Sequence, residues 1–216
     1  MAQTRSRGRP RDPNLVVRRR GEILSAAALM FAEQGYRTAD LQILADRLGI
    51  GKGTLYRYFA TKRDLFLACV DRAMRRLKES VESSATSATD PLDRIARAVR
   101  AYLAFFDAHP DCVELFIQER AEFKSRKKSS YFVHRDANIG PWHDLFRDLI
   151  AAGSLRKVPV PRITDVLSDL LYGTIFTNAL AGRRKSLETQ AHDILDIVFH
   201  GIVAHHSGVG PVRRRP

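Results

Sequence analysis

The chain has 216 residues, of which 44% are hydrophobic, and a net charge of +12; this composition is typical of a globular protein of one or two domains and excludes a disordered or membrane-embedded chain. Residues 1–63 contain 13 Lys or Arg and 5 Asp or Glu, a net charge of +8, and such a basic cluster favours nucleic acid as a partner. Because the N-terminus has no apolar signal segment and no run of 18 apolar residues occurs, we expect a cytoplasmic, nucleoid-associated protein without membrane contacts.

Residues 1–20 are expected to form a basic flexible arm, because they show no apolar periodicity. The run "RGRP", which begins at Arg7, is the core of motifs that lie extended in the narrow A·T-rich minor groove of DNA. Arg7 and Arg9 would be the side chains inserted into that groove. The alternative is a solvated tail.

Short helices separated by glycines are predicted from residue 21 onward. The first, in "ILSAAALMFAEQGY", ends at Gly35 and has an inner apolar stripe formed by Ile23, Ala27, Met30 and Phe31. The second, "DLQILADRLG", has apolar residues at i, i+3, i+4 and i+7, namely Leu41, Leu44, Ala45 and Leu48. Asp40 is a suitable N-cap for this helix and Gly49 a suitable stop.

The stretch "GIGKGTLYRYF", Gly49 to Phe59, resembles a phosphate-binding loop but lacks its spacing of Gly, four residues, Gly-Lys and Ser or Thr. We predict instead a helix from about Gly51 to Phe59, which completes a helix-turn-helix. Leu55 and Phe59 define its buried side, so Gly53 and Arg57 point outward. This small cationic face suits DNA, and the alternative is a solvated face on a core helix.

The next helix is expected to be long, from Lys62 to about Ser80. Thr61 and Asp64 have the spacing of a capping box at its start. A small, polar connection, "VESSATSATDP" from residue 81 to 91, is expected to follow it.

The run from Gly21 to Val70, including "LADRLGI", "GTLYRYF" and "TKRDLF", resembles the N-terminal DNA-binding domain of TetR/AcrR-type transcriptional regulators. Two positions depart from the family pattern: Gly51 stands where Ser or Thr is usual, and Ala39 stands where Thr is common, so contacts from those hydroxyls cannot be expected. The resemblance implies a DNA-binding surface made of Arg37, Thr38, Gly51, Lys52, Gly53, Thr54, Tyr56, Arg57, Tyr58 and Lys62.

An all-α architecture follows from the resemblance and from the helical periods. It comprises a helix-turn-helix domain over 21–66, a helical effector-binding and dimerisation domain over 67–206, and a flexible basic tail over 207–216. The implied protein is a dimeric repressor that binds a short inverted repeat in double-stranded DNA and is released by a small effector. The alternatives are a regulator without an effector and an architectural A·T-binding protein that uses mainly the arm.

The larger domain is predicted to be helical throughout, with "EFKSRKKSSYFV" (residues 122–133) as a cationic, mobile link. Its aromatic residues are mostly core residues by spacing, but some could enclose a small apolar or aromatic effector: Phe105, Phe116, Trp142, Phe146, Tyr172 and Phe176. By the resemblance, the last two helices (162–181 and 187–205) form the dimer interface, through apolar residues that include Val166, Leu170, Ile175, Ile194, Ile197, Val198 and Ile202.

No catalytic or metal site is predicted. His109 and Cys112 lie three residues apart and His205 is next to His206, but neither pair supplies the further ligands that zinc requires. No serine has the context of a nucleophile. Cys69 and Cys112 are expected to be buried free thiols rather than a redox switch, and we expect neither enzymatic activity nor a cofactor.

Overall fold

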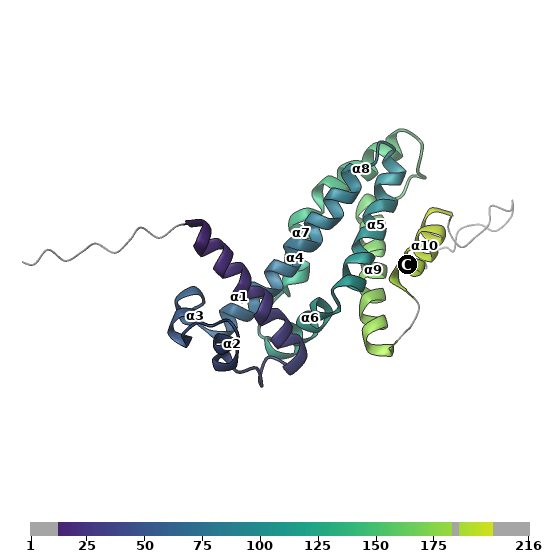
Figure 1. Ribbon diagram of the computed structural model, residues 1–216. Coiled ribbons are helices and arrows are strands. Elements are labelled where there is room, and N and C mark those ends of the chain that lie inside the picture. The colour runs from purple at the N-terminus through teal and green to yellow at the C-terminus, as the bar shows by residue number, and fades with distance from the viewer. Residues whose placement is uncertain (1–12, 183–185, 201–216) are drawn as a thin grey trace, which may run out of the picture. The chain divides into compact units, whose positions relative to one another are not determined.

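The computed structural model describes residues 13–182 and 186–200, and all regular structure in these ranges is α-helical (Figure 1). The expected all-α fold class is therefore confirmed. The helices are α1 (Pro13–Gln34), α2 (Leu41–Arg47), α3 (Lys52–Tyr58), α4 (Lys62–Thr86), α5 (Pro91–Ala108), α6 (Pro110–Glu122), α7 (Ser130–Asn138), α8 (Gly140–Ala151), α9 (Val160–Ala181) and α10 (Leu187–His200). None of these described helices is long and apolar enough to cross a membrane.

The chain divides into two compact units, and α4 contributes to both. The first unit comprises residues 1–79 and 109–140, and the second comprises residues 80–108 and 141–216. The helix-turn-helix therefore shares a unit with α6 and α7, although 29 residues, 80–108, separate these segments from the first part of that unit. The sequence-based boundary between residues 66 and 67 falls inside α4.

The first unit is built around α1, which packs against α6 and α2, while α2 packs against α3. The expected stripe of α1 is fully buried: Ile23, Ala27, Met30 and Phe31. Four rings continue this core, since Phe66 lies 5.1 Å from Phe31, 5.2 Å from Tyr36 and 5.5 Å from Phe123 between ring centroids. These rings connect the end of α1, the start of α4 and the end of α6.

Local capping fixes the ends of the short helices as the sequence predicts. The Asp40 carboxylate accepts a 2.7 Å hydrogen bond from the Gln42 backbone N–H, and Gly49 ends α2 with a positive φ of 61° that favours glycine. At the start of α4 the Thr61 hydroxyl accepts from the Asp64 N–H at 3.0 Å and donates to the Asp64 carboxylate at 2.8 Å. The loops around α3 are therefore fixed at both ends.

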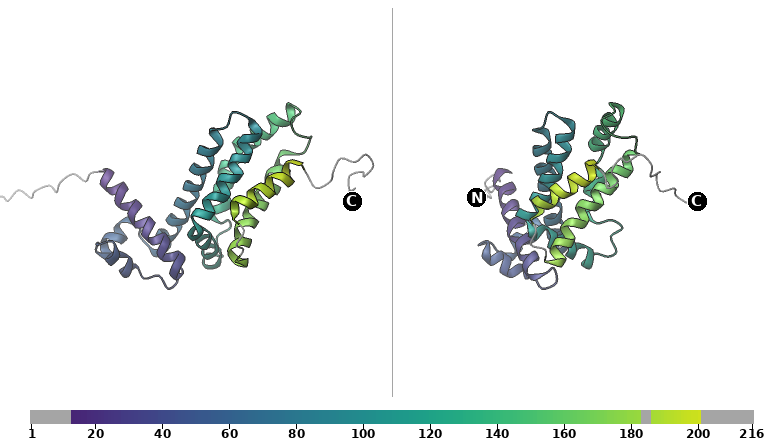
Figure 2. Two further views of the ribbon diagram at one scale, coloured as in Figure 1. Left: turned by 45° about the vertical axis from the view of Figure 1, so that its right-hand side comes forward. Right: turned by 90° about the vertical axis from the view of Figure 1, so that its right-hand side faces the viewer.

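The second unit is a group of helices in which α5 packs against α9 and α10, and α10 lies along α9 (Figure 2). Ile95, Phe146 and Leu149 form a buried cluster that joins α5 to α8. The Asp107 carboxylate accepts a 3.0 Å hydrogen bond from the N–H of Leu187, the first residue of α10. The end of α5 therefore caps α10.

Three helix boundaries differ from the sequence-based expectation. Helix α1 begins at Pro13, so residues 13–20 belong to a helix rather than to the arm. Helix α4 continues to Thr86 rather than ending near Ser80, because Ala85 is buried and extends its packed face. The expected link at 122–133 ends in the first turn of α7, a helix that its sequence does not predict.

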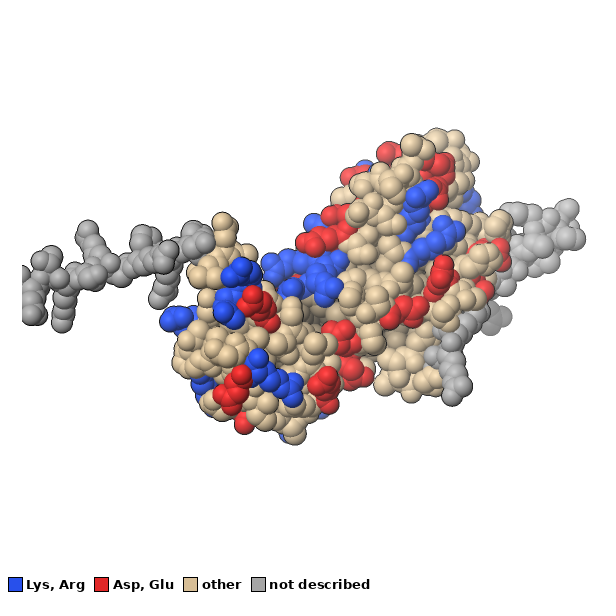
Figure 3. Space-filling view, viewed as in Figure 1, with Lys and Arg blue, Asp and Glu red and all other residues tan. Residues whose placement is uncertain are grey.

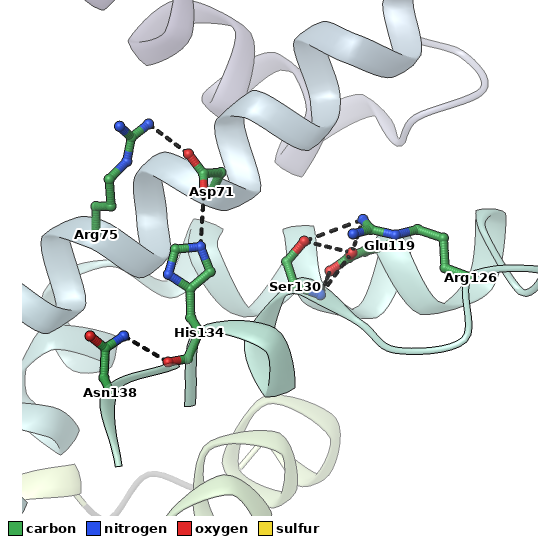
Figure 4. Close-up of polar contacts among 7 residues, drawn as sticks. All are labelled: Asp71, Arg75, Glu119, Arg126, Ser130, His134 and Asn138. Atoms are coloured by element: carbon green, nitrogen blue, oxygen red, sulfur yellow. Dashed lines mark hydrogen bonds and ion pairs between the residues drawn. The ribbon is translucent and has the colours of Figure 1, made fainter. Parts of the chain in front are cut away.

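The N-terminus of α7 is fixed by a buried carboxylate from α6 (Figure 4). Glu119 is only 2% exposed and accepts hydrogen bonds from the Ser130 N–H at 3.0 Å and from its hydroxyl at 2.8 Å. Arg126 donates to the same carboxylate at 2.5 Å. Farther along α7, His134 Nε2 lies 2.8 Å from the Asp71 carboxylate of α4. These contacts hold α7 to its own unit and explain why a cationic segment becomes helical there.

Candidate nucleic-acid interface

Helix α3 separates a buried side from an exposed side as predicted. Leu55 is 1% exposed and Phe59, its C-cap, is also buried. Lys52, Gly53 and Arg57 are exposed. Among the other expected contact residues, Tyr56 is exposed and Thr54 and Tyr58 are half-buried. A helix seven residues long thus presents a small, cationic surface to its surroundings.

The glycines at the start of α3 are not required by packing inside the chain. A Cβ atom placed on Gly51 or Gly53 would meet no atom within 4 Å. Gly51 is the N-cap of α3 and makes no side-chain capping bond, in agreement with the missing hydroxyl at this position. The absence of side chains at these two positions leaves the helix backbone open to close approach by a partner.

Arg37, one of the expected phosphate contacts, is 80% exposed but its Nε–H donates to both carboxylate oxygens of Glu122, at 2.9 and 2.8 Å. This charge-assisted bond raises the pKa of the Arg37 guanidinium. Next to it, the Thr38 hydroxyl donates to the Gln34 carbonyl at the end of α1. Arg37 and Thr38 therefore lie together on the α1–α2 turn.

Lys62, the first residue of α4, joins the same region. Its ammonium donates a 3.0 Å hydrogen bond to the Arg37 carbonyl and lies 5.3 Å from the centre of the Tyr36 ring. Partial burial lowers its pKa. The structure therefore brings Lys62 next to the turn between α1 and α2 that contains Arg37 and Thr38. This turn precedes α2, and Lys62 follows α3.

Two arginines lie beside the expected contacts although the sequence does not single them out. The Arg20 guanidinium lies 4.7 Å from the centre of the Phe59 ring, at the end of α3, and the Arg63 guanidinium lies 5.5 Å from the centre of the Phe123 ring. Arg20 ends the basic run "RRR" at 18–20, which is expected in the arm. The run by itself indicates a basic segment, but only the structure shows that it lies on α1.

Charge on the surface is mixed rather than uniformly basic. Figure 3 shows Lys and Arg side chains interspersed with Asp and Glu side chains on the face in view. In α1, Arg19 pairs with Glu22 at 2.9 Å, and in α4 Arg75 pairs with Asp71 at 2.6 Å. Some Lys and Arg side chains are therefore already paired with carboxylates, and fewer positive charges can bind a polyanion than the net charge of a segment suggests.

The six aromatic residues expected at an effector site are distributed over helices of both units. Phe146 of α8 belongs to the buried cluster with Ile95 and Leu149, and Trp142 of α8 packs against that cluster. Tyr172 and Phe176 of α9 lie 4.5 Å apart between ring centroids, and Phe105 packs on Phe106 at 5.3 Å. These residues belong to the second unit. Phe116 belongs to the first unit, where it is buried 6.0 Å from Tyr131.

The residues expected at a dimer interface are partly exposed on α9 and α10. Val166, Leu170 and Ile197 are exposed apolar side chains, and Ile194 and Val198 are half-buried. Ile175 is expected on the same face, but it is buried and belongs to the core of its unit. Arg7, Arg9, Ile202 and the pair His205 and His206 lie outside the described residues.

Both cysteines are free and buried, as expected. Burial raises the pKa of the Cys69 thiol to about 12 and that of the Cys112 thiol to about 12. Within 13–182 and 186–200, no three His, Cys, Asp or Glu side chains are grouped so that they could hold a metal ion.

Comparison with known proteins points to the same region. Residues 23–69 match the family described as bacterial regulatory proteins, tetR family. Over 72 residues the chain is 39% identical to the HTH-type transcriptional activator FasR of Mycolicibacterium smegmatis, covering 33% of this chain and 31% of FasR. Over 57 residues it is 46% identical to the HTH-type transcriptional repressor KstR2 of Mycobacterium tuberculosis, covering 26% of each. The chain thus spans less than a third of the length of these two relatives.

The fold extends beyond that region. The transcriptional regulator FadR from Bacillus subtilis, solved in complex with stearoyl-CoA, matches 85% of this chain and 99% of its own with a TM-score of 0.68. Its sequence identity is 17%, so this likeness shows a shared fold and no more.

Proposed function

Because residues 23–69 match the family described as bacterial regulatory proteins, tetR family, we propose that this chain belongs to that family and is a sequence-specific DNA-binding transcriptional regulator. In this proposal it acts as a dimer on a short inverted repeat, and a small-molecule effector changes its affinity for DNA. Release from the DNA would make it a repressor. FasR is an activator and KstR2 a repressor, so the direction of regulation is a separate question for experiment.

The observation that carries the proposal is the outward face of α3. Lys52, Gly53 and Arg57 are exposed although nothing within the unit requires a glycine at position 53. A helix that enters the major groove must bring its backbone close to the base edges, and an arginine can bind guanine through two hydrogen bonds. The face of α3 meets both requirements, with Arg57 and Tyr56 as the proposed base-reading residues.

The surrounding elements supply the phosphate contacts in this proposal. Arg37 and Thr38 on the α1–α2 turn and Lys62 at the start of α4 flank α3 on the chain. The N-terminus of α4 adds the positive end of a helix dipole, which attracts phosphate oxygens, although the Asp64 N–H is already bonded to Thr61. Phosphate contacts of this kind fix the position of the recognition helix without reading the sequence.

Dimerisation and effector binding are assigned to the region 67–206. The exposed side chains Val166, Leu170 and Ile197 would be covered by a second copy, because apolar side chains grouped on neighbouring helices are typical of an interface. Ile194 and Val198 would lie beside them. Helix α4 belongs to both units, so an effector bound in the second unit could move the recognition helix through α4.

Selection of bound DNA from a random pool tests this function. We expect one enriched sequence with two inverted half-sites, whereas an architectural protein would enrich A·T content without a defined sequence. Deleting residues 1–12 removes Arg7 and Arg9 but spares α1, which begins at Pro13. A sequence-specific footprint that survives this deletion supports the regulator, and loss of all binding supports the architectural alternative.

The effector is tested by thermal-shift screening with small apolar and aromatic compounds. A long-chain acyl-CoA belongs in the screen because FadR, which shares the fold, was solved with stearoyl-CoA. A compound that raises the melting temperature and weakens binding to the selected DNA would be an effector. If none of the compounds does so, the regulator without an effector is favoured.

A further inference from the structure

The loop between α6 and α7 adjoins the elements that bracket α3. Glu122, the last residue of α6, binds Arg37 of the α1–α2 turn at 2.8 Å. Phe123, the next residue, packs its ring 5.0 Å from Tyr36 and lies under the guanidinium of Arg63, 5.5 Å away. The loop therefore starts at the point where the α1–α2 turn and the first turn of α4 meet.

This loop is a fixed turn rather than a free chain. The Arg126 N–H donates to the Phe123 carbonyl at 2.9 Å, which places Lys124 and Ser125 at the corners of a tight turn. The Arg126 side chain points inward and binds the buried Glu119, which also holds the Ser130 N–H. The end of the segment at Arg126 and Ser130 is thus anchored to Glu119 (Figure 4), and its start is anchored through Glu122 and Phe123.

The anchored loop presents two lysines to solvent. Lys124 and Lys127 are exposed, and neither pairs with any carboxylate among the described residues. The other two basic residues of the loop are engaged, since Arg126 pairs with Glu119 and Lys128 pairs with Asp136. Arg63 in the first turn of α4 is also exposed, and its guanidinium lies over the ring of Phe123, the residue before Lys124.

We propose that Lys124 and Lys127, here called the α6–α7 strip, form a second phosphate-binding site that contacts the DNA backbone outside the base pairs read by α3. The strip follows α6 and is not part of the helix-turn-helix. The loop that carries it is nevertheless held by Glu122, which pairs with Arg37, one of the proposed phosphate contacts of that motif. A lysine ammonium on a fixed turn suits a backbone phosphate, which requires charge rather than a defined edge of a base. This inference rests on the proposed function, because it requires DNA on α3.

The test uses the full chain and the DNA sequence selected above, placed in duplexes with flanks of decreasing length. The variant is Lys124→Gln together with Lys127→Gln, and the matched control is Lys157→Gln, an exposed lysine in the loop between α8 and α9 of the second unit. We expect the slope of log affinity against log salt to become flatter by roughly 0.9 per lost contact, about 1.8 for each protomer bound. The control should leave this slope unchanged.

Flank length gives the decisive comparison. Wild-type affinity should fall when the flanking base pairs are removed, and the variant should no longer respond to their removal, because its contacts to them are already absent. The strip is refuted if the variant selects the same sequence with the same salt slope and the same dependence on flank length. If the wild-type chain selects no sequence at all, the proposed function fails first, and the inference fails with it.

Discussion

Leu55 and Arg57 lie two residues apart on α3 and have opposite environments, since Leu55 is buried and Arg57 is exposed. Truncating each should therefore have a different effect. Leu55→Ala leaves a cavity and should lower the free energy of unfolding by about 2 to 5 kcal/mol. Arg57→Ala should leave stability unchanged and weaken binding to the selected DNA by about 1 to 3 kcal/mol, with relaxed specificity at one base pair.

Thermal unfolding and DNA titration of the two variants measure these effects. Tyr56→Ala should behave like Arg57→Ala, because Tyr56 is also exposed on α3. Unchanged affinity in both the Tyr56 and Arg57 variants would remove α3 from the interface.

The two cysteines offer a second residue-scale prediction. A thiol whose pKa is raised to about 12, as burial does for Cys69 and Cys112, carries about one thiolate in 10⁴ at pH 8. Neither cysteine should react with a thiol reagent in the native protein at that pH. Both should react in guanidinium chloride, and rapid native labelling of either would contradict their burial.

At the scale of the element, α7 depends on Glu119 more than on its own sequence. Glu119→Ala removes the acceptor of the Ser130 N–H and hydroxyl and of Arg126. Because it leaves the buried N–H of Ser130 without an acceptor and the half-buried Arg126 without its partner, we expect a loss of about 1 to 3 kcal/mol in the free energy of unfolding. Ser130→Ala, which removes one hydroxyl, should cost about 1 kcal/mol.

Hydrogen exchange locates the effect of these variants. The amides of α7 should exchange faster in Glu119→Ala than in the wild type. The amides of α1 should keep their protection against exchange, up to the limit that the free energy of global unfolding sets. Equal protection of α7 in Glu119→Ala and in the wild type would show that the cap is unimportant.

At the scale of the whole molecule, the exposed apolar side chains of α9 and α10 predict a dimer. Ile197 is 50% exposed, and burying a charge in its place without a partner would oppose association. Ile197→Asp should therefore give monomers by light scattering at concentrations where the wild type is dimeric. Val133 of α7 is 48% exposed and is the matched control, because Val133→Asp should leave the dimer mass unchanged.

A dimer that survives Ile197→Asp would exclude α10 from the interface. Loss of DNA affinity should accompany loss of the dimer, because a dimer binds both half-sites at once and a monomer binds only one. DNA binding by a monomeric Ile197→Asp at wild-type affinity would contradict the inverted-repeat mode.

The amino-acid sequence by itself determined the features whose causes are local. Asp40, Gly49 and the pair Thr61 and Asp64 define helix ends through hydrogen bonds over two to four residues, and the period of 3.6 places Leu55 inside and Arg57 outside. The order of the short helices and the all-α class follow from the same local rules. The candidate DNA-binding face of α3 is therefore predictable from the sequence alone.

Only the tertiary structure decided the features that depend on distant partners. Ser130 begins a helix because Glu119, 11 residues earlier, is buried beside it, and Arg37 binds Glu122, 85 residues away. Ile175 and Ile197 share a helical apolar pattern in sequence, yet one lies in the core and the other in solvent. Periodicity identifies the apolar side of a helix, but which neighbour covers that side is fixed by packing between segments far apart in the chain.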